Sequence, residues 1–372
     1  MTKQVSHLIV GLGLGGAETM LYQLLRYGQN DKVRHRVISL GLGDYYDKPI
    51  RDLGIEVIVL PVKKRPISSF IKLKRLLVFE DTLCCWMYHA NFLGEMAFRK
   101  LRKKGEKKLV WNIRHSNLEK KNNKRLTLML NKICAKRSKN VDVIAYNGQQ
   151  ARIAHESIGY SKTNGVVLDN GCDLQKYYPI REASEKLREE LGITREKKIV
   201  ISVSKDTPIK DLPTFIKAFG MARKMIPELV AVMCGSGVTP SNEKLQTQWQ
   251  EAGLVVGKDI FALGLRDDIP MIMSSSDLYV LHSAGEAFPN TLIQAMACEC
   301  LCVTTDVGDA KRILEDETMT VLPGDATNLS KTIVYALKLD EDTKKSKRAI
   351  NRQIVTEKFD IRSIVYEYQT LF

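Results

Sequence analysis

The sequence lacks any apolar run of the roughly 18–20 residues that a membrane-spanning helix requires. Its N-terminal apolar stretch, residues 8–14, is short and rich in glycine, and no signal-type cleavage site follows it. These absences argue against an integral membrane protein and against a secreted one. The composition that remains, 44% hydrophobic and 27% charged over 372 residues, is typical of a soluble globular protein. It predicts two domains of ordinary size in the cytoplasm.

Cysteine pairs of the Cys-x-x-Cys kind are also missing. The eight cysteines include the adjacent Cys84 and Cys85 and the alternating Cys298, Cys300 and Cys302. Neither spacing is that of a zinc site, so these side chains are predicted to pack as small buried apolar groups. The one Asp-x-Asp string, residues 340–342, lies among lysines near the C-terminus and is interpreted as a solvated loop. The sequence therefore predicts no metal site.

Acidic residues are almost absent from the segment 99–139. It contains 16 Lys and Arg but only Glu106 and Glu119, so it accounts for the whole net charge of +14. Such a patch predicts a polyanionic partner, either an anionic membrane surface or a lipid diphosphate. Its single aromatic residue, Trp111, argues against nucleic acid, because single strands are bound by aromatic side chains that stack on bases. A solvated helical face is the alternative interpretation.

Short apolar runs alternate with helical patterns along the whole chain. The predicted strands are 8–10, 37–40, 57–60, 83–87, 109–113, 141–145 and 166–168, followed by 199–203, 229–233, 260–263, 278–281, 301–303 and 319–322. Helical patterns lie between them, for example at 18–27, 118–136 and 181–198. Strands that alternate with helices imply parallel sheets. Because the pattern restarts after Pro179, we expect two Rossmann-like domains, 1–177 and 178–351.

The most informative segment is Gly285–Cys298. It follows the apolar run 278–281 and enters a predicted helix with Pro289 near the first turn, where proline is tolerated. Glu286 is thereby placed at the carboxyl end of a strand and beside a helix N-terminus. Ligands of open α/β sheets bind at such strand ends. The free N–H groups of a helix N-terminus favour a phosphate or diphosphate.

This segment resembles the donor-sugar motif of the family 4 retaining glycosyltransferases, in which seven residues separate two glutamates. The first glutamate is Glu286, and the second position holds Gln294. The resemblance implies that Glu286 contacts the sugar and that Phe288, Asn290, Thr291 and Gln294 help to bind the donor. Because glutamine keeps a carbonyl acceptor but loses the charge, we expect weakened donor affinity rather than abolished activity.

The same resemblance implies an α/β fold of the GT-B type. Two Rossmann-like domains with parallel sheets would face each other across a cleft. The first would be the acceptor side and the second would bind the nucleotide sugar. The last stretch, 352–372, is apolar at helical spacing, and in such enzymes the final helix crosses back to the first domain.

A glycine-rich loop follows the first predicted strand. Gly11, Gly13 and Gly16 satisfy the G-x-G-x-x-G pattern of dinucleotide-binding loops, which leaves an NAD-dependent oxidoreductase as an alternative. That alternative needs an acidic residue at the end of the second strand, and Asp44 comes several residues late. The string from Gly15 and Gly16 to Glu18 instead resembles the loop that opens many family 4 glycosyltransferases. There, glycines let the backbone approach the donor diphosphate and the acceptor. A tight turn with no ligand is the remaining interpretation.

Two lysines follow the first strand of the second half. Lys205 and Lys210 stand where the family pattern has Arg-x4-Lys, whose cations bind the donor diphosphate. Lysine keeps the charge but loses the planar fork of arginine. Both are expected to stabilise the leaving diphosphate as charge develops on it, without a metal. Two surface lysines without a ligand are the alternative. The loop 264–270, which contains Arg266, resembles the loop beside the nucleotide base.

Two predicted strands of the first half end close to a histidine, His89 in one case and His115 in the other. In the family, a histidine after a first-domain strand commonly contacts the transferred sugar. His115 is the better candidate for that catalytic role. His89, Arg114 and Asn117 are expected to bind the acceptor. The alternative for each histidine is an ordinary polar group that is satisfied locally.

These resemblances cover most of residues 8–340 in order. They imply a metal-independent, cofactor-free retaining hexosyltransferase that takes a sugar from a nucleotide sugar, with uridine as the expected base. The acceptor would be a saccharide on a polyprenyl diphosphate, in the synthesis of O-antigen, capsule or exopolysaccharide. The basic segment 99–139 would hold the protein at the inner face of the cytoplasmic membrane, with no nucleic acid as partner. A catalytically degenerate binding protein is the alternative.

Overall fold

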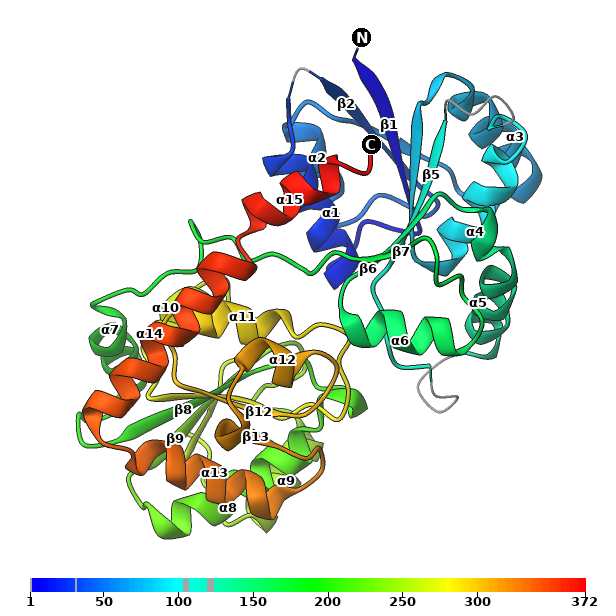
Figure 1. Cartoon of the computed structure of the whole chain (residues 1–372). Coiled ribbons are helices and arrows are strands. Elements are labelled where there is room, and N and C mark those ends of the chain that lie inside the picture. The colour runs from blue at the N-terminus through cyan, green and yellow to red at the C-terminus, as the bar shows by residue number, and fades with distance from the viewer. Residues whose placement is uncertain (1, 31, 103–106, 119–123) are drawn as a thin grey trace. The chain divides into compact units, whose positions relative to one another are not determined.

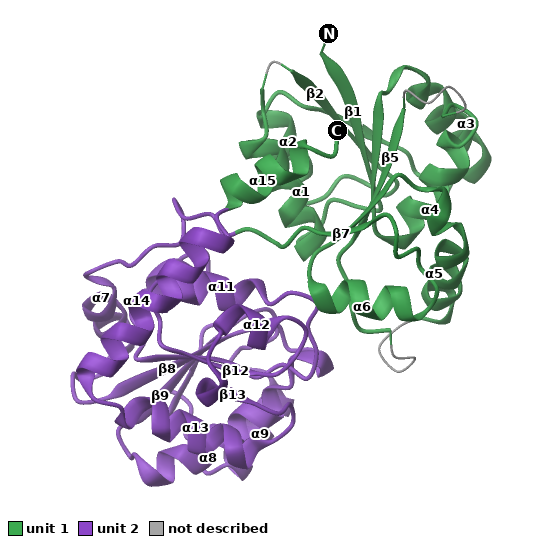
Figure 2. Cartoon of the chain, viewed as in Figure 1, with its two compact units in different colours: residues 1–171, 361–372 green, residues 172–360 purple. Residues whose placement is uncertain are grey.

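A computed structural model of the chain describes residues 2–30, 32–102, 107–118 and 124–372 (Figure 1). The chain forms two compact units. Unit 1 comprises Met1–Gly171 with Ile361–Phe372, and unit 2 comprises Cys172–Asp360 (Figure 2). Each unit is built on one parallel sheet with helices packed against it. The α/β class predicted from the alternating strand and helix patterns is therefore confirmed.

Unit 1 contains a seven-stranded sheet with the order β3-β2-β1-β4-β5-β6-β7, and every strand pair in it is parallel. The strands are β1 (Lys3–Ile9), β2 (Val33–Ser39), β3 (Glu56–Val59), β4 (Thr82–Trp86), β5 (Lys108–Ile113), β6 (Val143–Tyr146) and β7 (Gly165–Val167). The helices are α1 (Gly16–Tyr27), α2 (Asp47–Asp52), α3 (Pro66–Leu76), η1 (Leu77–Phe79), α4 (Met87–Phe98), α5 (Arg125–Arg137), η3 (Ser138–Asn140), α6 (Gln149–Ser157) and α15 (Ile361–Gln369).

Unit 2 contains a six-stranded parallel sheet with the order β10-β9-β8-β11-β12-β13. The strands are β8 (Lys198–Val203), β9 (Leu229–Cys234), β10 (Ile260–Ala262), β11 (Leu278–Leu281), β12 (Cys302–Thr305) and β13 (Thr320–Val321). The helices are α7 (Ala183–Leu191), η4 (Pro208–Lys210), α8 (Leu212–Met225), α9 (Glu243–Glu251), α10 (Ile269–Ser274), α11 (Asn290–Ala297), α12 (Ala310–Leu314), η5 (Glu317–Met319), α13 (Ala326–Lys338) and α14 (Glu341–Lys358).

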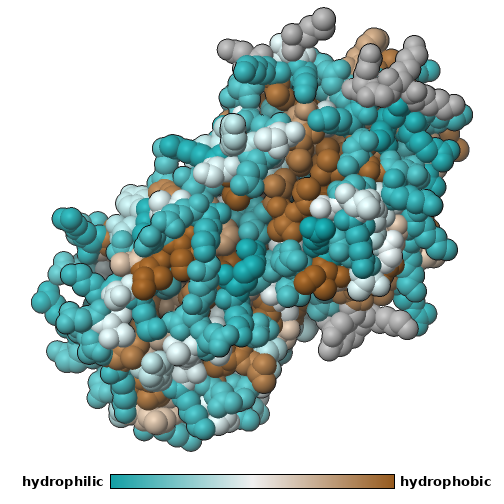
Figure 3. All heavy atoms as spheres, in the orientation of Figure 1, coloured by the Kyte–Doolittle hydropathy of each residue, from teal (hydrophilic) through white to brown (hydrophobic). Residues whose placement is uncertain are grey.

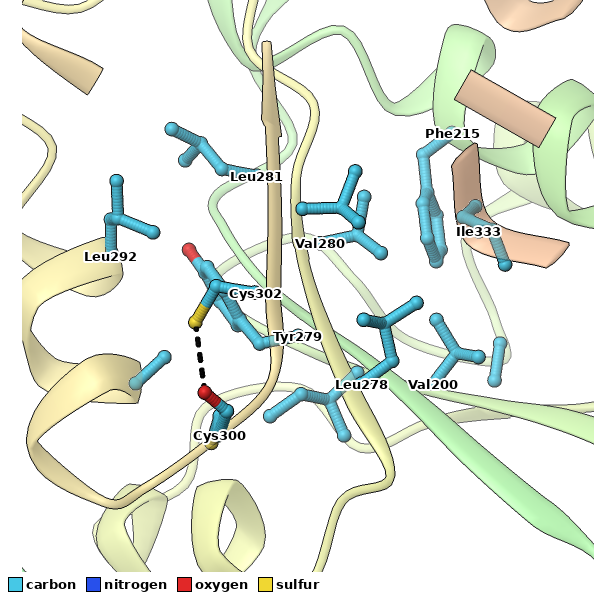
Figure 4. Packing of buried hydrophobic residues seen from close by; sticks show 14 of the residues in the cluster. Val200, Phe215, Leu278, Tyr279, Val280, Leu281, Leu292, Cys300, Cys302 and Ile333 are labelled. Carbon is cyan, nitrogen blue, oxygen red and sulfur yellow. Dashed lines mark hydrogen bonds between the residues drawn. The ribbon is translucent and has the colours of Figure 1, made fainter. Parts of the chain in front are cut away.

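Strand β11 shows why the central strands are continuous apolar runs in the sequence. All four of its side chains are buried. Leu281 points toward Leu292 of α11, whereas Val280 points toward Phe215 of α8 and Ile333 of α13 (Figure 4). A strand covered by helices on both faces has no polar side, so its sequence does not alternate.

All thirteen predicted strands are present, with ends that differ by a few residues. The helix predicted over 181–198 is shorter, because α7 ends where Gly192 adopts a left-handed conformation with φ of 63°. The helix predicted over 118–136 is α5, which begins at Arg125. Residues 119–123 of that range lie outside the described residues. The eight cysteines are all buried and unpaired.

The last helix belongs to unit 1, as expected. The C-terminal segment that returns to unit 1 is shorter than the predicted 352–372. Helix α14 remains in unit 2 to Lys358, and only residues from Ile361 onward pack in unit 1. There, the amide of Gln369 donates to the carbonyl oxygen of Gly28 over 2.7 Å. The first crossing between units lies at residues 171 and 172 rather than at 177 and 178. Within unit 2, Cys172 N–H donates to the Phe359 carbonyl oxygen over 2.7 Å.

Among the described residues, no helix is both long enough and apolar enough to cross a bilayer. The segment 99–139 contributes β5, α5 and the start of η3 to unit 1. Its residues 103–106 and 119–123 lie outside the described part of the chain.

Candidate active site

The strand order places a topological switch point at the centre of unit 2. From β8 the chain first builds β9 and β10 on one side, and it then returns to add β11 on the other. Strands β8 and β11 are direct neighbours, with Val200 paired to Leu278. The loops after such a pair diverge at the carboxyl edge of the sheet, and ligands bind in the crevice they leave. The loop after β8 carries Lys205 and Lys210, and the loop after β11 carries Glu286.

Lys210 and Glu286 meet at this switch point. The Lys210 ammonium forms an ion pair with Oε1 of Glu286, and the Ser283 hydroxyl donates to the same oxygen over 2.7 Å. The side chains are 25% and 11% exposed, so a ligand can reach them although most of their surface is covered. The structure therefore brings together the predicted diphosphate-binding cation and the predicted sugar-binding carboxylate.

His282 positions the backbone that carries Lys210. Its Nδ1 lies 2.6 Å from the Lys210 carbonyl oxygen and its Nε2 lies 2.6 Å from Oγ of Ser202. Because a carbonyl only accepts, Nδ1 carries the proton and Nε2 accepts from the serine. The ring stacks on Phe215 with centroids 4.9 Å apart. Burial lowers the pKa of His282 to about 4, so the ring is neutral at physiological pH. His282 is not among the residues predicted from the sequence. The signal that could have identified it is its position, as a polar residue directly after the apolar strand β11.

Two glycines allow the loops of the switch point to approach closely. Gly308, with φ of 53°, lies so near the motif that a Cβ would be 2.5 Å from the Glu286 carbonyl oxygen. Gly235, after β9, would place a Cβ only 1.9 Å from the Ser204 carbonyl oxygen. Ala284 N–H also donates to the Ile209 carbonyl oxygen over 2.8 Å. The backbone around Lys210 and Glu286 is therefore fixed from several sides.

The predicted donor-binding residues of α11 share one face of the helix. Asn290, Thr291 and Gln294 are half-exposed, whereas most other side chains of the helix are buried. The Tyr279 hydroxyl donates to Oγ1 of Thr291 over 2.8 Å and so fixes that side chain. Phe288 is buried, with its ring 5.7 Å from that of Phe359. Its side chain thus belongs to the core, and any contact with a donor falls to its backbone.

The side chains of Arg266 and Lys205 lie in different surroundings. The Arg266 guanidinium is bound by Asp268, at 2.7 and 2.8 Å, and by Glu190 of α7. Hydrogen bonds to Asp268 and Glu190 raise the pKa of Arg266. This arginine therefore joins α7 to the loop after β10, and two carboxylates already bind its guanidinium group. Lys205 is exposed in the loop after β8.

Unit 1 has a switch point of its own between β1 and β4. The loop after β1 holds Gly15 and Gly16 at the start of α1, where Gly15 is extended and its carbonyl oxygen accepts from Thr19 N–H over 2.9 Å. After β4, Met87 adopts a left-handed φ of 69°, a strained conformation of the kind found at functional sites. His89 follows on the first turn of α4. Burial, and then the charge of Lys63, lowers the pKa of His89.

Arg114 lies at the end of β5, but its contacts are inside unit 1. Its guanidinium donates to Asn170 and to the Tyr368 hydroxyl of α15, and it lies 5.1 Å from the centroid of the Trp86 ring. These contacts hold α15 against the sheet, and the acceptor contact expected of Arg114 stays a prediction. His115 and Asn117 follow it and are half-exposed.

Two protein comparisons concern the sequence. Residues 183–353 match the family model described as Glycosyl transferases group 1. N-acetyl-alpha-D-glucosaminyl L-malate synthase of Bacillus anthracis is 28% identical over 220 residues, which are 59% of this chain and 55% of that protein. UDP-Gal:alpha-D-GlcNAc-diphosphoundecaprenol alpha-1,3-galactosyltransferase of Escherichia coli is 27% identical over 153 residues, 41% of this chain and 39% of that protein. The matches thus span about half, or less, of the length of these relatives.

A third comparison concerns the fold. The crystal structure of Anabaena HepE in complex with UDP superposes with a TM-score of 0.85 at 22% sequence identity, covering 99% of this chain and 98% of that one. At this identity the likeness establishes the architecture alone. The group 1 glycosyltransferase model matches residues 183–353, a little under half of the chain, and the whole chain shares the two-unit architecture of the HepE structure.

Proposed function

We propose that the chain is a retaining glycosyltransferase that moves a sugar from a nucleotide sugar to a lipid-linked saccharide. The observation that carries this proposal is the ion pair of Lys210 and Glu286 at the switch point of unit 2. One cation and one carboxylate side by side suit a donor that carries both a diphosphate and a hydroxyl-rich sugar. A diphosphate attracts the ammonium, and sugar hydroxyls donate to the carboxylate.

In the proposed donor complex, Lys210 and Lys205 bind the diphosphate and Glu286 accepts hydrogen bonds from sugar hydroxyls. The half-exposed face of α11, with Asn290 and Gln294, binds the ribose side of the nucleotide. Uridine is the proposed base, and the UDP complex of the structurally similar HepE supports it. Gly15 and Gly16 of unit 1 would let backbone approach the diphosphate or the acceptor.

In the proposed reaction the bond between the anomeric carbon and the diphosphate oxygen breaks. A new bond to the acceptor oxygen forms on the same face of the sugar, and the leaving phosphate takes the acceptor's proton. Negative charge then grows on the diphosphate, where the ammonium of Lys210 stabilises it more strongly than in the ground state. This scheme requires neither a protein nucleophile nor a metal.

The acceptor is proposed from charge and from one relative. The Escherichia coli relative acts, by its name, on a diphosphoundecaprenol-linked sugar, and the basic segment 99–139 suits a lipid diphosphate or an anionic membrane. The Bacillus anthracis relative, by its name, makes a glucosaminyl malate, so a small acid is the competing acceptor class. We favour the lipid-linked acceptor, and with it attachment to the inner face of the cytoplasmic membrane. Transfer to a small acid such as malate would not require a basic segment.

The first experiment is a thermal unfolding series with UDP, GDP, CMP and NAD at millimolar concentration. A ligand at about 100 times its dissociation constant adds about 2.7 kcal/mol to the free energy of unfolding. We expect a shift with UDP that Lys210→Gln reduces. A shift with NAD alone would overturn the proposal in favour of an oxidoreductase. The anomeric configuration of the product, read by NMR, then tests retention.

A further inference from the structure

Helix α3 and the η1 turn after it expose a line of apolar side chains. Ile67, Ile71 and Val78 follow one another at spacings of four and seven residues, which places them on one face. Ile67 is 78% exposed, and Phe79 at the far end is 82% exposed. Four large apolar side chains, counting Val78 and Phe79 of η1, are thus exposed within residues 67–79. Apolar areas also lie among the hydrophilic residues on the face drawn in Figure 3.

A groove between α3 and α4 continues this apolar line. It has a volume of about 370 Å³ and is lined by Val62, Ile67, Phe70, Ile71, Phe92 and Met96, among others. A second hollow of about 340 Å³ shares Met96 with it and is lined by Val78 and by Lys74, Arg75, Arg99 and Lys100. The two hollows therefore form one surface, apolar along its floor and basic at one end.

Among the described residues of 61–79 and 92–102, the exposed charges are all positive. They are Lys63, Lys64, Arg65, Lys72, Lys74, Arg75, Arg99 and Lys100. No acidic residue occurs in 61–79. In 92–102 the only one is Glu95, which is buried and paired with Arg137 of α5. We call this combination of apolar line, groove and cations the α3–α4 surface.

We propose that the α3–α4 surface docks onto an anionic lipid bilayer, with Ile67, Ile71 and Phe79 entering the hydrocarbon boundary. An apolar face flanked by lysine and arginine is the pattern of helices that lie in the membrane interface. Each cation is attracted to the negative surface of the cytoplasmic leaflet. The inference deepens the proposed function and rests on it, because a lipid-linked acceptor is bound at a bilayer.

Other occupants of the α3–α4 surface fit less well. A second copy of the chain would bring two sets of like charges face to face, which disfavours the contact. Nucleic acid would meet the cations, but bases stack on flat aromatic side chains. The two in the groove, Phe70 and Phe92, already have Lys74 and Arg137 over their rings, 4.7 and 6.0 Å from the ring centroids. A bilayer satisfies the charges and the apolar line at once.

The α3–α4 surface also begins beside the candidate acceptor residue of unit 1. Lys63 lies close enough to His89 for its charge to lower the pKa of that histidine. Helix α4 begins at Met87, with His89 in its first turn, and ends at Phe98, directly before Arg99 and Lys100. A bilayer on this surface would therefore present its headgroup region next to His89. We expect an acceptor whose diphosphate stays at headgroup level to reach that residue without leaving the membrane.

Vesicle co-sedimentation tests the proposal, with vesicles of phosphatidylcholine alone and with added phosphatidylglycerol. The wild-type protein is expected to bind only the anionic vesicles. The variant Ile67→Ser/Ile71→Ser/Phe79→Ser and the variant Lys72→Gln/Lys74→Gln/Arg75→Gln are each expected to bind at least about tenfold more weakly. All six side chains are exposed, so the variants should fold, which thermal unfolding checks.

Matched controls change exposed residues elsewhere. Ile153→Ser/Val255→Ser/Ile350→Ser and Lys217→Gln/Lys258→Gln/Lys338→Gln are expected to bind vesicles as the wild type does. The proposal is overturned if the α3–α4 variants bind as tightly as these controls, or if the wild type ignores anionic vesicles. It is also overturned if the apolar variant only dissociates a dimer in sedimentation velocity runs. The UDP-induced thermal shift should survive in every variant. Its absence in the wild type would count against the proposed function while leaving vesicle binding to be judged separately.

Discussion

The side chains of Lys210 and Glu286, 76 residues apart in the sequence, form an ion pair between the loops that follow β8 and β11. In the proposed donor complex both ions change partners, the ammonium to the diphosphate and the carboxylate to sugar hydroxyls. The pair thus keeps each charged group satisfied and in place while the site is empty. Residue pairs with this arrangement contribute more to function than to stability when they are partly exposed.

Replacing either partner should therefore reduce catalysis far more than it reduces stability. We expect Lys210→Gln and Glu286→Gln to lower the transfer rate by about 10²–10³-fold. The free energy of unfolding should change by only about 1 kcal/mol, as for a partly exposed pair. Initial rates and urea unfolding measure the two effects. Lys311→Gln breaks the 2.7 Å ion pair with Glu317 as a control, and rates that fall no further than in that control would refute the assignment.

Gln294→Glu should tighten the binding of UDP. A hydrogen bond to a charged group contributes about 1.5–3 kcal/mol against about 1 kcal/mol for a neutral one, which corresponds to about a tenfold lower dissociation constant. Isothermal titration calorimetry with UDP measures the change. Gln250→Glu, at an exposed position of α9, controls for the added charge. Unchanged or weaker binding in Gln294→Glu would show that this side chain does not face the ribose.

Gly308→Ala should damage the site through the loop of Glu286. The new Cβ would lie 2.5 Å from the Glu286 carbonyl oxygen, and the backbone has φ of 53°. Gly324→Ala is a matched control, because Gly324 has φ of 77° and nothing within 4 Å of a Cβ. Each variant should lose about 1–2 kcal/mol for the left-handed backbone, measured by urea unfolding. Only Gly308→Ala should also lose transfer activity. Equal activity in the two variants would contradict the proposed role of the close contact.

Stability should fall as the pH falls from 6.5 to 4. Burial lowers the pKa of His155 and of His282 to about 4, whereas an unfolded histidine has a pKa of about 6.5. Above pH 6.5 neither state binds the proton, so stability is unaffected. Between pH 6.5 and 4 only the unfolded state binds it, and each buried group costs up to about 3 kcal/mol by pH 4.

Urea unfolding at several pH values tests this acid sensitivity. His282→Asn keeps a donor near the Lys210 carbonyl oxygen but removes one titrating group. Its loss of stability between pH 6.5 and 4 should be smaller than that of the wild type by up to about 3 kcal/mol. An identical pH dependence in the two proteins would mean that His282 is accessible to protons in the folded state.

Arg114→Gln should loosen α15 from unit 1. The variant loses the contacts with Tyr368, Asn170 and the Trp86 ring, and lost hydrogen bonds to a charged group cost about 1.5–3 kcal/mol. Limited proteolysis should then cut near residue 360 sooner than in the wild type. Arg152→Gln, which breaks a partly buried pair with Glu156 on α6, is the control. A raised KM for the acceptor with unchanged proteolysis would instead support acceptor binding by Arg114.

The sequence allowed the fold class, all thirteen strands and the residues of the switch point to be predicted, because these follow from local patterns and from the motif. The strand ends bring Lys210 near Glu286 in any doubly wound sheet, but the pairing of the two side chains depends on rotamers and on Ser283. Arg114 looked like a site residue by its place after β5. Its contacts with Asn170 and Tyr368 could not be predicted, because no local pattern connects those residues to it.

The α3–α4 surface escaped sequence analysis for a different reason. Outside the segment 99–139 the positive and negative charges balance in number. That balance hides the fact that residues 61–79 carry cations only. The apolar side chains of α3 cannot be divided into buried and exposed ones from the sequence. Ser69 and Leu73 on one side of the helix are buried. Only the structure separates the buried face from the exposed one.

The return of α15 to unit 1 also affects the order in which the chain folds during synthesis. All residues of unit 2 have been made when Asp360 is added, whereas unit 1 still lacks Ile361–Phe372. Until those residues emerge, the core cluster that contains Met20, Leu24 and Trp86 lacks Ile364, Val365 and Tyr368. Unit 1 is therefore begun first and finished last. A chain that stops at residue 360 would contain a complete second unit joined to an incomplete first one.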